Sequence, residues 1–470
     1  MFCNEIIRKI AKLDWMEIFS DLFFSRRWTV GVLFFFFSVI FLVSIDNSIA
    51  ENTKPVDPMD SKIEALEQQI QKLMKEIKEI KKDHGAEKMD RNEDRKIVSE
   101  LQNKVEKISQ ANFLNEGSWI NKFNLGGYGE MHANFTVDDD QDKFDIHRLV
   151  LYLGYDFKEW IKFHSELELE HAFVSDGDGE LSIEQAYVDF LVSKPFNIRV
   201  GRILTPIGII NKKHEPPSFN GVERPSFAKY IVPSTWSSDG IGFFGTLAPT
   251  VKYETYVVGG LDGSAFTAKN GIRSGRIKER QSLSDPAVTG RLDFYPFAQR
   301  TIGYDQRLRM GLSAYLGGVD NGNDGNNPGI DGDIAIYSGD FEYSILGLDF
   351  RGAIAFEDIG GSREIGNGTA DEIFGWYLEG GYHVFPETFK KGLLEKSDAV
   401  VFLRYDDYDT QYKLPSGIAE DPTGDRHEWT LGFNFYPIPN FVIKADYQIR
   451  EDGTDKDLKD LFNLGIGWQF

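Results

Sequence analysis

The clearest pattern in the chain is an alternation of apolar and polar residues over its last ten positions, 461–470. Successive side chains point to opposite faces of a strand, so this stretch predicts one apolar face and one polar face of little bulk. The apolar face consists of Phe462, Leu464, Ile466, Trp468 and Phe470. Such alternation is typical of membrane β-barrels, although the edge strand of a soluble β-sandwich would share it.

The same alternation recurs along residues 111–470, in about sixteen segments of strand character. The connections between these segments alternate between short and long. Short ones include Lys158-Glu159, Ser193–Pro195, Ala248–Thr250, Ser344-Ile345 and Pro437–Asn440. The long, polar ones cover 137–143, 174–180, 205–236, 261–286, 319–331, 358–371, 409–426 and 451–457. Short turns alternating with long loops indicate an all-β transmembrane barrel of about sixteen antiparallel strands, whereas a sandwich gives no such rhythm.

The N-terminal region follows other patterns. An apolar run, Trp28–Ile45, follows Arg26 and Arg27 and precedes small residues, which predicts a signal peptide over 1–50; an uncleaved membrane anchor is the alternative. A linker is expected over 51–58. Residues 59–110 carry apolar residues in alternating steps of three and four, which predicts an α-helical coiled-coil stalk in the periplasm. The heptads do not decide between a dimer and a trimer.

Composition agrees with a barrel and narrows the partners. The chain has 46 glycines, 14% aromatic residues and a negative mean hydropathy of -0.34, which does not suit a helical membrane protein. The net charge of -22 excludes a nucleic-acid partner, which would require a basic face. The one cysteine, Cys3, lies in the predicted signal peptide, so the remaining chain has no thiol for a disulfide or a metal.

Charged residues in strand segments are expected to point into the lumen, because an Arg or Lys facing lipid at the membrane midplane costs about 2–4 kcal/mol. The predicted pore wall comprises Arg148, Lys162, Glu166, Glu168, Glu170, Arg291, Arg309, Arg351, Glu379, Arg404 and Asp446. These columns suit a polar conduit that biases ion passage. For any one of them, pairing with an opposite charge on the neighbouring strand is the favoured explanation, because such pairing is common.

The connection 205–236 is the longest, and it is too rich in proline and apolar residues for a floppy surface loop. If this loop folds into the barrel, it narrows the pore. It would then present Lys212, Lys213, His214, Glu215, Arg224 and Lys229 at the constriction.

Residues around this loop resemble the phosphate-selective porin O/P family. The resemblance is carried by the stretches EQAYVDF (184–190), VGRILTPIG (200–208) and HEPPSFNGVERP (214–225), together with the terminal Phe470. It implies a trimeric, sixteen-stranded outer-membrane channel with loops folded inward. Phosphate selectivity in the family rests on an arginine ladder and a lysine cluster, and the acidic column 166–170 leaves open whether this chain shares it.

The sequence therefore predicts a porin in the outer membrane of a Gram-negative bacterium, a water-filled channel for passive diffusion of small hydrophilic solutes and ions. Expected partners are membrane lipid, lipopolysaccharide, other copies in a homotrimer and, through the stalk, the cell wall. The alternative is a tether that joins the outer membrane to the cell wall. We expect no enzyme, since none of the histidines has a recognisable catalytic context. No cofactor or metal is expected, because 320–333 lacks the closing glutamate of a calcium loop.

Overall fold

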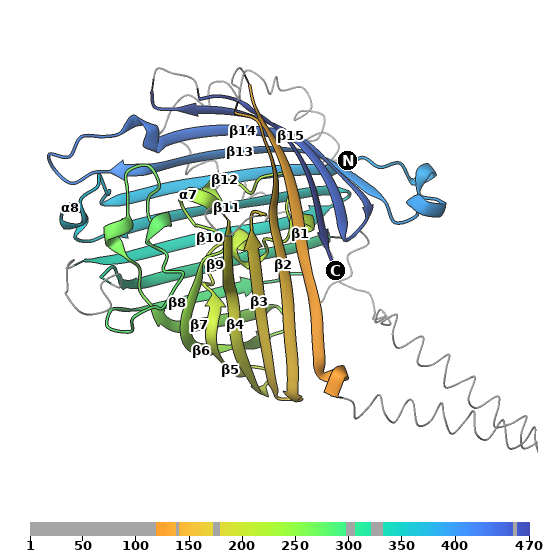
Figure 1. Cartoon of the computed structure of the whole chain (residues 1–470), viewed down its shortest axis with the longest axis horizontal. Helices are drawn as coiled ribbons and strands as arrows, with labels where there is room; N and C mark the ends of the chain where they lie inside the picture. The colour runs from red at the N-terminus through yellow and green to blue at the C-terminus, as the bar shows by residue number, and fades with distance from the viewer. Residues whose placement is uncertain (1–118, 138–140, 173–178, 298–305, 321–331, 455–457) are drawn as a thin grey trace, which may run out of the picture. The chain divides into compact units, whose positions relative to one another are not determined.

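The computed structural model describes residues 119–137, 141–172, 179–297, 306–320, 332–454 and 458–470 (Figure 1). The predicted signal peptide, linker and coiled-coil stalk all lie outside these residues. Among the described residues, no helix combines the length and the apolar character needed to cross a bilayer.

Sixteen antiparallel strands form a closed barrel, in which each strand pairs with its neighbours in sequence and β1 pairs with β16 (Figure 1). The strands are β1 (Phe123–Thr136), β2 (Lys143–Lys158), β3 (Ile161–Glu170), β4 (Glu180–Ser193), β5 (Phe196–Leu204), β6 (Ser237–Ala248), β7 (Val251–Gly259), β8 (Pro286–Phe294), β9 (Gln306–Gly318), β10 (Asp333–Ile345), β11 (Leu348–Ile359), β12 (Glu372–His383), β13 (Asp398–Lys413), β14 (Asp425–Ile438), β15 (Phe441–Asp452) and β16 (Leu461–Gln469). Closure pairs Tyr128 with Gln469 and Thr136 with Leu461, so no strand edge is left unpaired. The predicted barrel of sixteen antiparallel strands is confirmed.

Short helices interrupt the connections. They are η1 (Trp119–Lys122), α6 (Ile209–Lys212), η2 (Pro216–Ser218), α7 (Phe227–Tyr230), η3 (Gly263–Ala265), η4 (Arg273–Gly275), α8 (Ser362–Ile365), η6 (Glu387–Phe389), η7 (Gly392–Leu394) and η8 (Pro422–Gly424). Three of them, α6, η2 and α7, belong to the connection 205–236 between β5 and β6.

The connections separate into two ends, as the sequence predicts. Between β2 and β3 only two residues intervene, and the same holds between β4 and β5 and between β10 and β11; we call this end the short-turn end. The connections 205–236 and 260–285 lie at the opposite, long-loop end. The strand bounds differ from those expected by one to a few residues, because turn residues continue the apolar pattern of the strands beside them.

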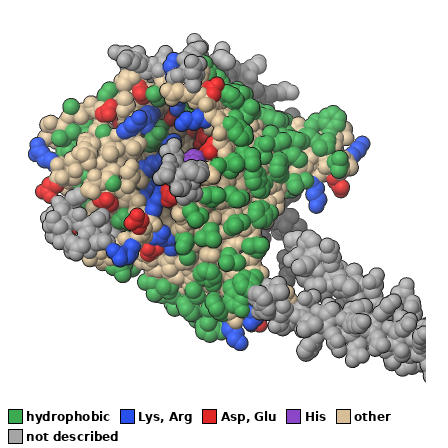
Figure 2. All heavy atoms as spheres, in the orientation of Figure 1, with side chains coloured by type: hydrophobic (Ala, Val, Ile, Leu, Met, Phe, Trp, Pro, Cys, Tyr) green, Lys and Arg blue, Asp and Glu red, His purple; other side chains and the backbone are tan. Residues whose placement is uncertain are grey.

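The outer face of the barrel is apolar. On β16, Phe462, Leu464 and Ile466 are about 40% exposed, whereas Asn463 between the first two is fully buried. Figure 2 shows hydrophobic side chains covering the outer wall of the strands. The apolar face of the last strand therefore points outward, toward lipid in an outer-membrane barrel.

The inner face is not uniformly polar. In the half of the barrel near the long loops, aromatic side chains of the wall point inward and pack against the connection 205–236. Trp236 lies 5.0 Å from the ring of Tyr315, Phe227 lies 5.6 Å from Tyr377, and Tyr230 stacks on Tyr408. An apolar core thus lies inside the barrel, and the simple rule of polar residues inside does not predict it.

Candidate functional site: the constriction inside the barrel

The connection 205–236, here called the inner loop, is closed at its base by one asparagine. The side-chain amide of Asn211 donates to the carbonyl oxygens of Thr205 (2.7 Å) and Trp236 (3.1 Å) and accepts from the backbone N–H of Trp236 (2.8 Å). Asn211 is buried, so these bonds satisfy groups that water does not reach. Asn211 therefore links the two ends of the inner loop to each other.

Strands β15 and β16 hold the middle of the inner loop. Lys444 donates from Nζ to the carbonyl oxygens of Phe219 (2.9 Å) and Gly221 (2.7 Å), and this ammonium group also lies 3.7 Å from the centre of the Phe219 ring. The carboxylate of Asp446 accepts from the backbone N–H of Val222 (2.6 Å) and from Asn463 (2.8 Å). Both charged side chains therefore bind the loop instead of lining open water.

Strands β12–β14 hold the next part of the loop. Asn220 donates to Glu379 (2.9 Å) and accepts from Asn434 (2.6 Å), and its carbonyl oxygen accepts from Arg404 (3.2 Å). The Arg404 guanidinium also lies 3.6 Å from Glu379 and 3.2 Å from Asp406. Charges of the wall thus pair with one another and with the loop backbone.

Basic residues of the loop reach the opposite wall. Lys212 forms an ion pair with Glu254 on β7 (2.8 Å), and Lys213 with Glu342 on β10 (2.9 Å). Glu342 also pairs with Arg309 (2.8 Å) and with Arg351 (3.1 Å). Arg291 and Arg309 share Asp340, at 2.8 and 2.6 Å, and both also contact Asp293. This wall is a network of alternating charges.

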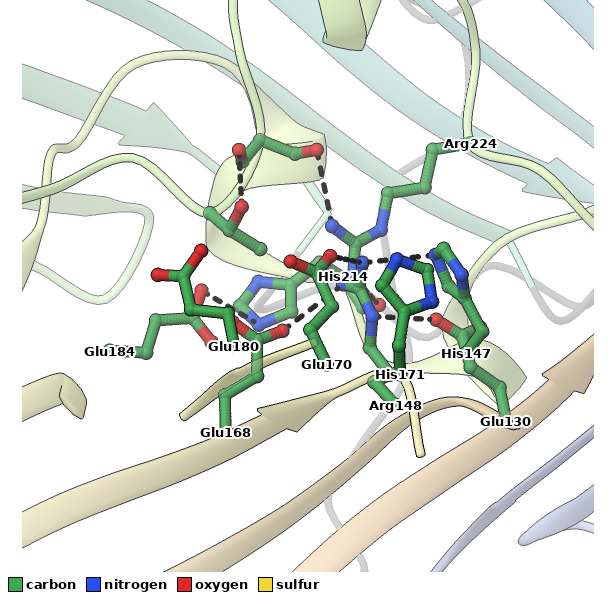
Figure 3. A network of polar contacts seen from close by, with 12 residues as sticks. Glu130, His147, Arg148, Glu168, Glu170, His171, Glu180, Glu184, His214 and Arg224 are labelled. Carbon is green, nitrogen blue, oxygen red and sulfur yellow. Dashed lines mark hydrogen bonds and ion pairs between the residues drawn. The ribbon is translucent and has the colours of Figure 1, made fainter. Parts of the chain in front are cut away.

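A second network lies on β1–β4 (Figure 3). Arg148 contacts Glu130 (3.0 Å), Glu168 (3.5 Å) and Glu170 (2.9 Å), so one guanidinium serves three carboxylates. Beside it, His214 of the inner loop faces Glu166 on β3 and Glu184 on β4.

Two side chains of the inner loop have strongly shifted proton affinities. Burial disfavours the charged form of His214, but Glu184 and Glu166 outweigh burial and raise its pKa to about 10. Partial burial would raise the pKa of Glu223, yet the imidazole of His132, 3.1 Å away, holds it well below its usual range. Glu223 is therefore a firmly ionised carboxylate near neutral pH.

The structure brings together most of the residues predicted for the constriction and wall. His214 meets Glu166, Lys213 meets Arg309 and Arg351 around Glu342, Arg148 meets Glu168 and Glu170, and Arg404 meets Glu379. Other predicted residues lie apart from these groups. Lys162 pairs with Asp156 (2.8 Å) near the short-turn end, Lys229 is exposed over the ring of Tyr230, Arg224 donates to the carbonyl oxygen of His214 (3.1 Å), and Glu215 precedes η2.

The contacting residues that were missed include Glu130, His132, Glu184, Glu254, Asp340 and Glu342. Each belongs to a strand, and the inward phase of β10 would have selected Asp340 and Glu342, whereas Glu184 lies where a register shift breaks the alternation of β4. Glu130 is harder to place, because a register shift between Glu130 and Met131 breaks the alternation of β1. The clamping role of Asp446 and Arg404 has no signal in sequence, since it depends on where the loop docks.

Comparison with known proteins identifies the chain's relatives. A protein of Aquifex aeolicus strain VF5, described as an uncharacterized protein, is 34% identical over 365 residues, covering 74% of this chain and 79% of the relative. Among solved structures, the anion-selective porin from Comamonas acidovorans is 13% identical, covers 74% of this chain and 99% of its own, and gives a TM-score of 0.46. OprB of Pseudomonas putida is 11% identical, with 76% and 97% covered and a TM-score of 0.48. Residues 124–270 and 357–461, more than half of the chain, match the family described as phosphate-selective porin O and P, so the chain belongs to that family.

Proposed function

We propose that this outer-membrane porin passes small hydrophilic solutes and ions with weak charge selectivity, through the space that the inner loop leaves in the lumen. Membership of the porin family supports the channel itself, which is a path for passive diffusion across the outer membrane. The tether considered as an alternative gains no support, because the stalk it requires lies outside the described residues. The charges around the constriction bear on which ions it favours.

One observation carries weak selectivity: the basic side chains predicted for the wall all have carboxylate partners. Arg148, Lys162, Arg291, Arg309, Arg351 and Arg404 each form at least one ion pair, as do Lys212 and Lys213 of the inner loop. A passing ion responds to the summed field of these charges, and adjacent opposite charges largely cancel over a Debye length of about 8–10 Å. Neither anions nor cations are then strongly favoured.

The same pairing bears on phosphate. A ladder that conducts phosphate needs guanidinium groups that are free to bind it. Here Arg291 and Arg309 are shared between Asp293 and Asp340, and Arg404 lies between Glu379, Asp406 and the inner loop. A phosphate ion would have to displace carboxylates that already form charge-assisted hydrogen bonds. We therefore expect phosphate to permeate as one small anion among others.

Reversal potentials in planar bilayers test this proposal. In a tenfold potassium chloride gradient we expect a small reversal potential of either sign, and we expect millimolar phosphate to leave the chloride current nearly unchanged. A reversal potential close to the limit for pure anion passage, or block of the chloride current by micromolar phosphate, would contradict weak selectivity. A correctly folded barrel that conducts no ions at all would contradict the channel.

The assembly is proposed on the family resemblance and the sequence. We infer a homotrimer in contact with lipid and lipopolysaccharide, with residues 1–50 removed as a signal peptide and 59–110 forming a periplasmic stalk that reaches toward the cell wall. Three conductance steps of equal size per inserted particle, and a trimer in native mass spectrometry, are the expected results. If deletion of 59–110 changes neither the stability of the trimer nor the attachment of the outer membrane to the cell wall, the stalk has neither role.

A further inference from the structure

Three buried side chains converge where the inner loop meets β3 and β4. Nε2 of His214 lies 3.7 Å from Oε1 of Glu166 and 3.6 Å from Oε1 of Glu184, and the three ligand-type atoms lie within 4.8 Å of one another. Their residues are 1–4% exposed. In Figure 3 the imidazole of His214 and the carboxylate of Glu184 point toward the same small volume.

The atoms that face this volume have no hydrogen-bond partner among the described residues. They are Nε2 of His214, Oε1 of Glu166 and both carboxylate oxygens of Glu184. Hydrogen bonds between nitrogen and oxygen span about 2.7–3.2 Å, so 3.6 and 3.7 Å are too long. Buried polar atoms nearly always have partners, and burial of a carboxylate without one is strongly unfavourable. A cation bound between these atoms would give each of them a partner.

The atoms of His214 and Glu166 that do not face this volume have hydrogen-bond partners, as the corresponding atoms of metal ligands usually do. Nδ1 of His214 lies 3.1 Å from the carbonyl oxygen of Asn211, which can only accept, so Nδ1 carries the proton and leaves the lone pair of Nε2 available. Metal-binding histidines typically donate their second N–H to such an acceptor. The second oxygen of Glu166 accepts from Gln185 (2.5 Å), which orients that carboxylate.

We propose that Glu166, Glu184 and His214 bind a divalent transition-metal ion, with Zn²⁺ the best match. Zinc bonds to imidazole nitrogen and carboxylate oxygen are about 2.0–2.2 Å long, which places two tetrahedral ligands about 3.3–3.6 Å apart. The two separations between His214 and the carboxylates, 3.7 and 3.6 Å, lie within a few tenths of an ångström of this range. Two carboxylates neutralise the ion, and mixed nitrogen and oxygen ligands suit zinc better than calcium or magnesium. Three protein ligands leave the fourth position for water.

A proton on Nε2 of His214 is the competing occupant. An imidazolium between two carboxylates would approach one of them to about 2.7–2.9 Å in a charge-assisted hydrogen bond. Instead, the two distances are long and nearly equal, as around a shared central ion. The nearby guanidinium groups are engaged elsewhere: Arg224 donates to the carbonyl oxygen of His214 and to Ser234, and Arg148 contacts Glu130, Glu168 and Glu170.

The proposed metal would join the inner loop to the barrel wall. Glu166 and Glu184 belong to the paired strands β3 and β4, with Glu184 at a β-bulge, whereas His214 lies between α6 and η2 in the loop. A bound ion would fix the loop to β3 and β4, in addition to the contacts with Lys444 on β15, and so set the width of the constriction. No metal is expected from the sequence, and these three ligands are far apart in the chain and follow no familiar spacing.

Metal content and metal-dependent stability test the site in the trimer purified in detergent. After chelation with EDTA and dialysis, the protein is loaded with Zn²⁺ and its bound zinc is measured by mass spectrometry. We expect one zinc per chain and a higher midpoint of thermal unfolding in the wild type. E184Q and H214Q should lower zinc affinity by more than about tenfold and abolish the stabilisation.

Matched controls separate this site from other imidazoles. H164Q alters a histidine on β3 outside the cluster, and H171Q alters the group of Asp145, His147 and His171. Both should keep the zinc. Retention by E184Q and H214Q, zinc loss only in H171Q, or no zinc in the wild type would each overturn the proposal. Co²⁺ serves as a second probe that needs no variant: the wild type should develop visible absorption that saturates at one equivalent and disappears when Zn²⁺ is added, and absence of that signal overturns the site.

Channel activity stays a separate measurement. The metal-free protein should still conduct, with larger current fluctuations than the zinc-loaded protein. Absence of conductance in both states would count against the proposed channel and not against the metal site.

Discussion

The ammonium group of Lys444 lies 2.9 Å from the carbonyl oxygen of Phe219 and 3.7 Å from the centre of that residue's ring. One wall side chain therefore binds the backbone and the aromatic ring of the same loop residue. Because Lys444 is buried, water cannot replace these contacts. The position of the inner loop thus depends on the charge of Lys444. The alternation pattern of the strand predicts only that this side chain faces the lumen.

Lys444→Met should loosen the loop. Met keeps the apolar stem but removes both hydrogen bonds, and losing buried bonds to a charged group costs about 2–5 kcal/mol in total. We expect a lower midpoint of thermal unfolding and a larger, noisier single-channel current. Lys252→Met is the matched control, since Lys252 is exposed over the ring of Tyr295. An unchanged current in Lys444→Met would show that other contacts hold the loop.

Asn211→Asp tests the clip at the base of the loop. The carboxylate keeps an acceptor for the backbone N–H of Trp236 but turns oxygen toward the carbonyl groups of Thr205 and Trp236. Two lost donor bonds in a buried position cost about 2–4 kcal/mol, before any repulsion between the oxygens. Chemical denaturation of the refolded barrel measures this loss. Asn440→Asp, in an exposed turn, should change the midpoint little, and equal effects of the two changes would contradict the clip.

Glu342→Gln should shift ion selectivity toward anions. Glu342 pairs with Lys213, Arg309 and Arg351, so its neutralisation leaves three cations with one carboxylate fewer. The reversal potential in a potassium chloride gradient should move in the direction of chloride. Glu387→Gln removes the same charge from an exposed position in η6 and should leave the potential unchanged. A shift toward cations, or identical shifts in both variants, would place the controlling charges elsewhere.

Acid should weaken the contact between the inner loop and β1. Because His132 lowers the pKa of Glu223 despite burial, the stabilisation is complete above the ordinary value of 4.5 and is lost as pH falls through the lowered folded-state value. The groups facing this carboxylate are His132, His147, Lys229 and Asn134. Current fluctuations of the wild type should therefore rise when the pH is lowered well below 4.5, as the folded carboxylate binds a proton.

Glu223→Gln is the variant for this pH test. It removes the ionisable group but keeps an oxygen that can accept from Asn134. Its fluctuations should already be raised at neutral pH and should depend less on acid. If wild type and variant respond to acid in the same way, carboxylates other than Glu223 control the transition.

How much of this molecule the sequence predicts depends on whether a contact lies within the wall or between wall and loop. The alternation on β16 correctly places Phe462 outside and Asn463 inside, because side-chain direction follows from strand geometry alone. The same rule brings Arg148 to Glu168 on the neighbouring strand. The rule does not predict that Tyr315 and Tyr377 point inward, because an aromatic side chain in the lumen is stable only when other residues cover it. Trp236 and Phe227 of the inner loop provide that cover.

The glycines of the last strand show what the loop requires of the wall, and they give the final prediction. A Cβ on Gly467 would lie 2.3 Å from Cβ of Pro216, whereas one on Gly380 of β12 would meet nothing closer than 3.6 Å. The small polar face of β16 is therefore the space into which η2 docks. Gly467→Ala should displace η2 and lower stability by about 1–3 kcal/mol, the usual cost of overpacking. Gly380→Ala should be neutral or slightly stabilising, because alanine restricts the unfolded chain. Thermal unfolding and single-channel current together decide this: a stable Gly467→Ala barrel with unchanged current would mean that η2 does not rest on β16.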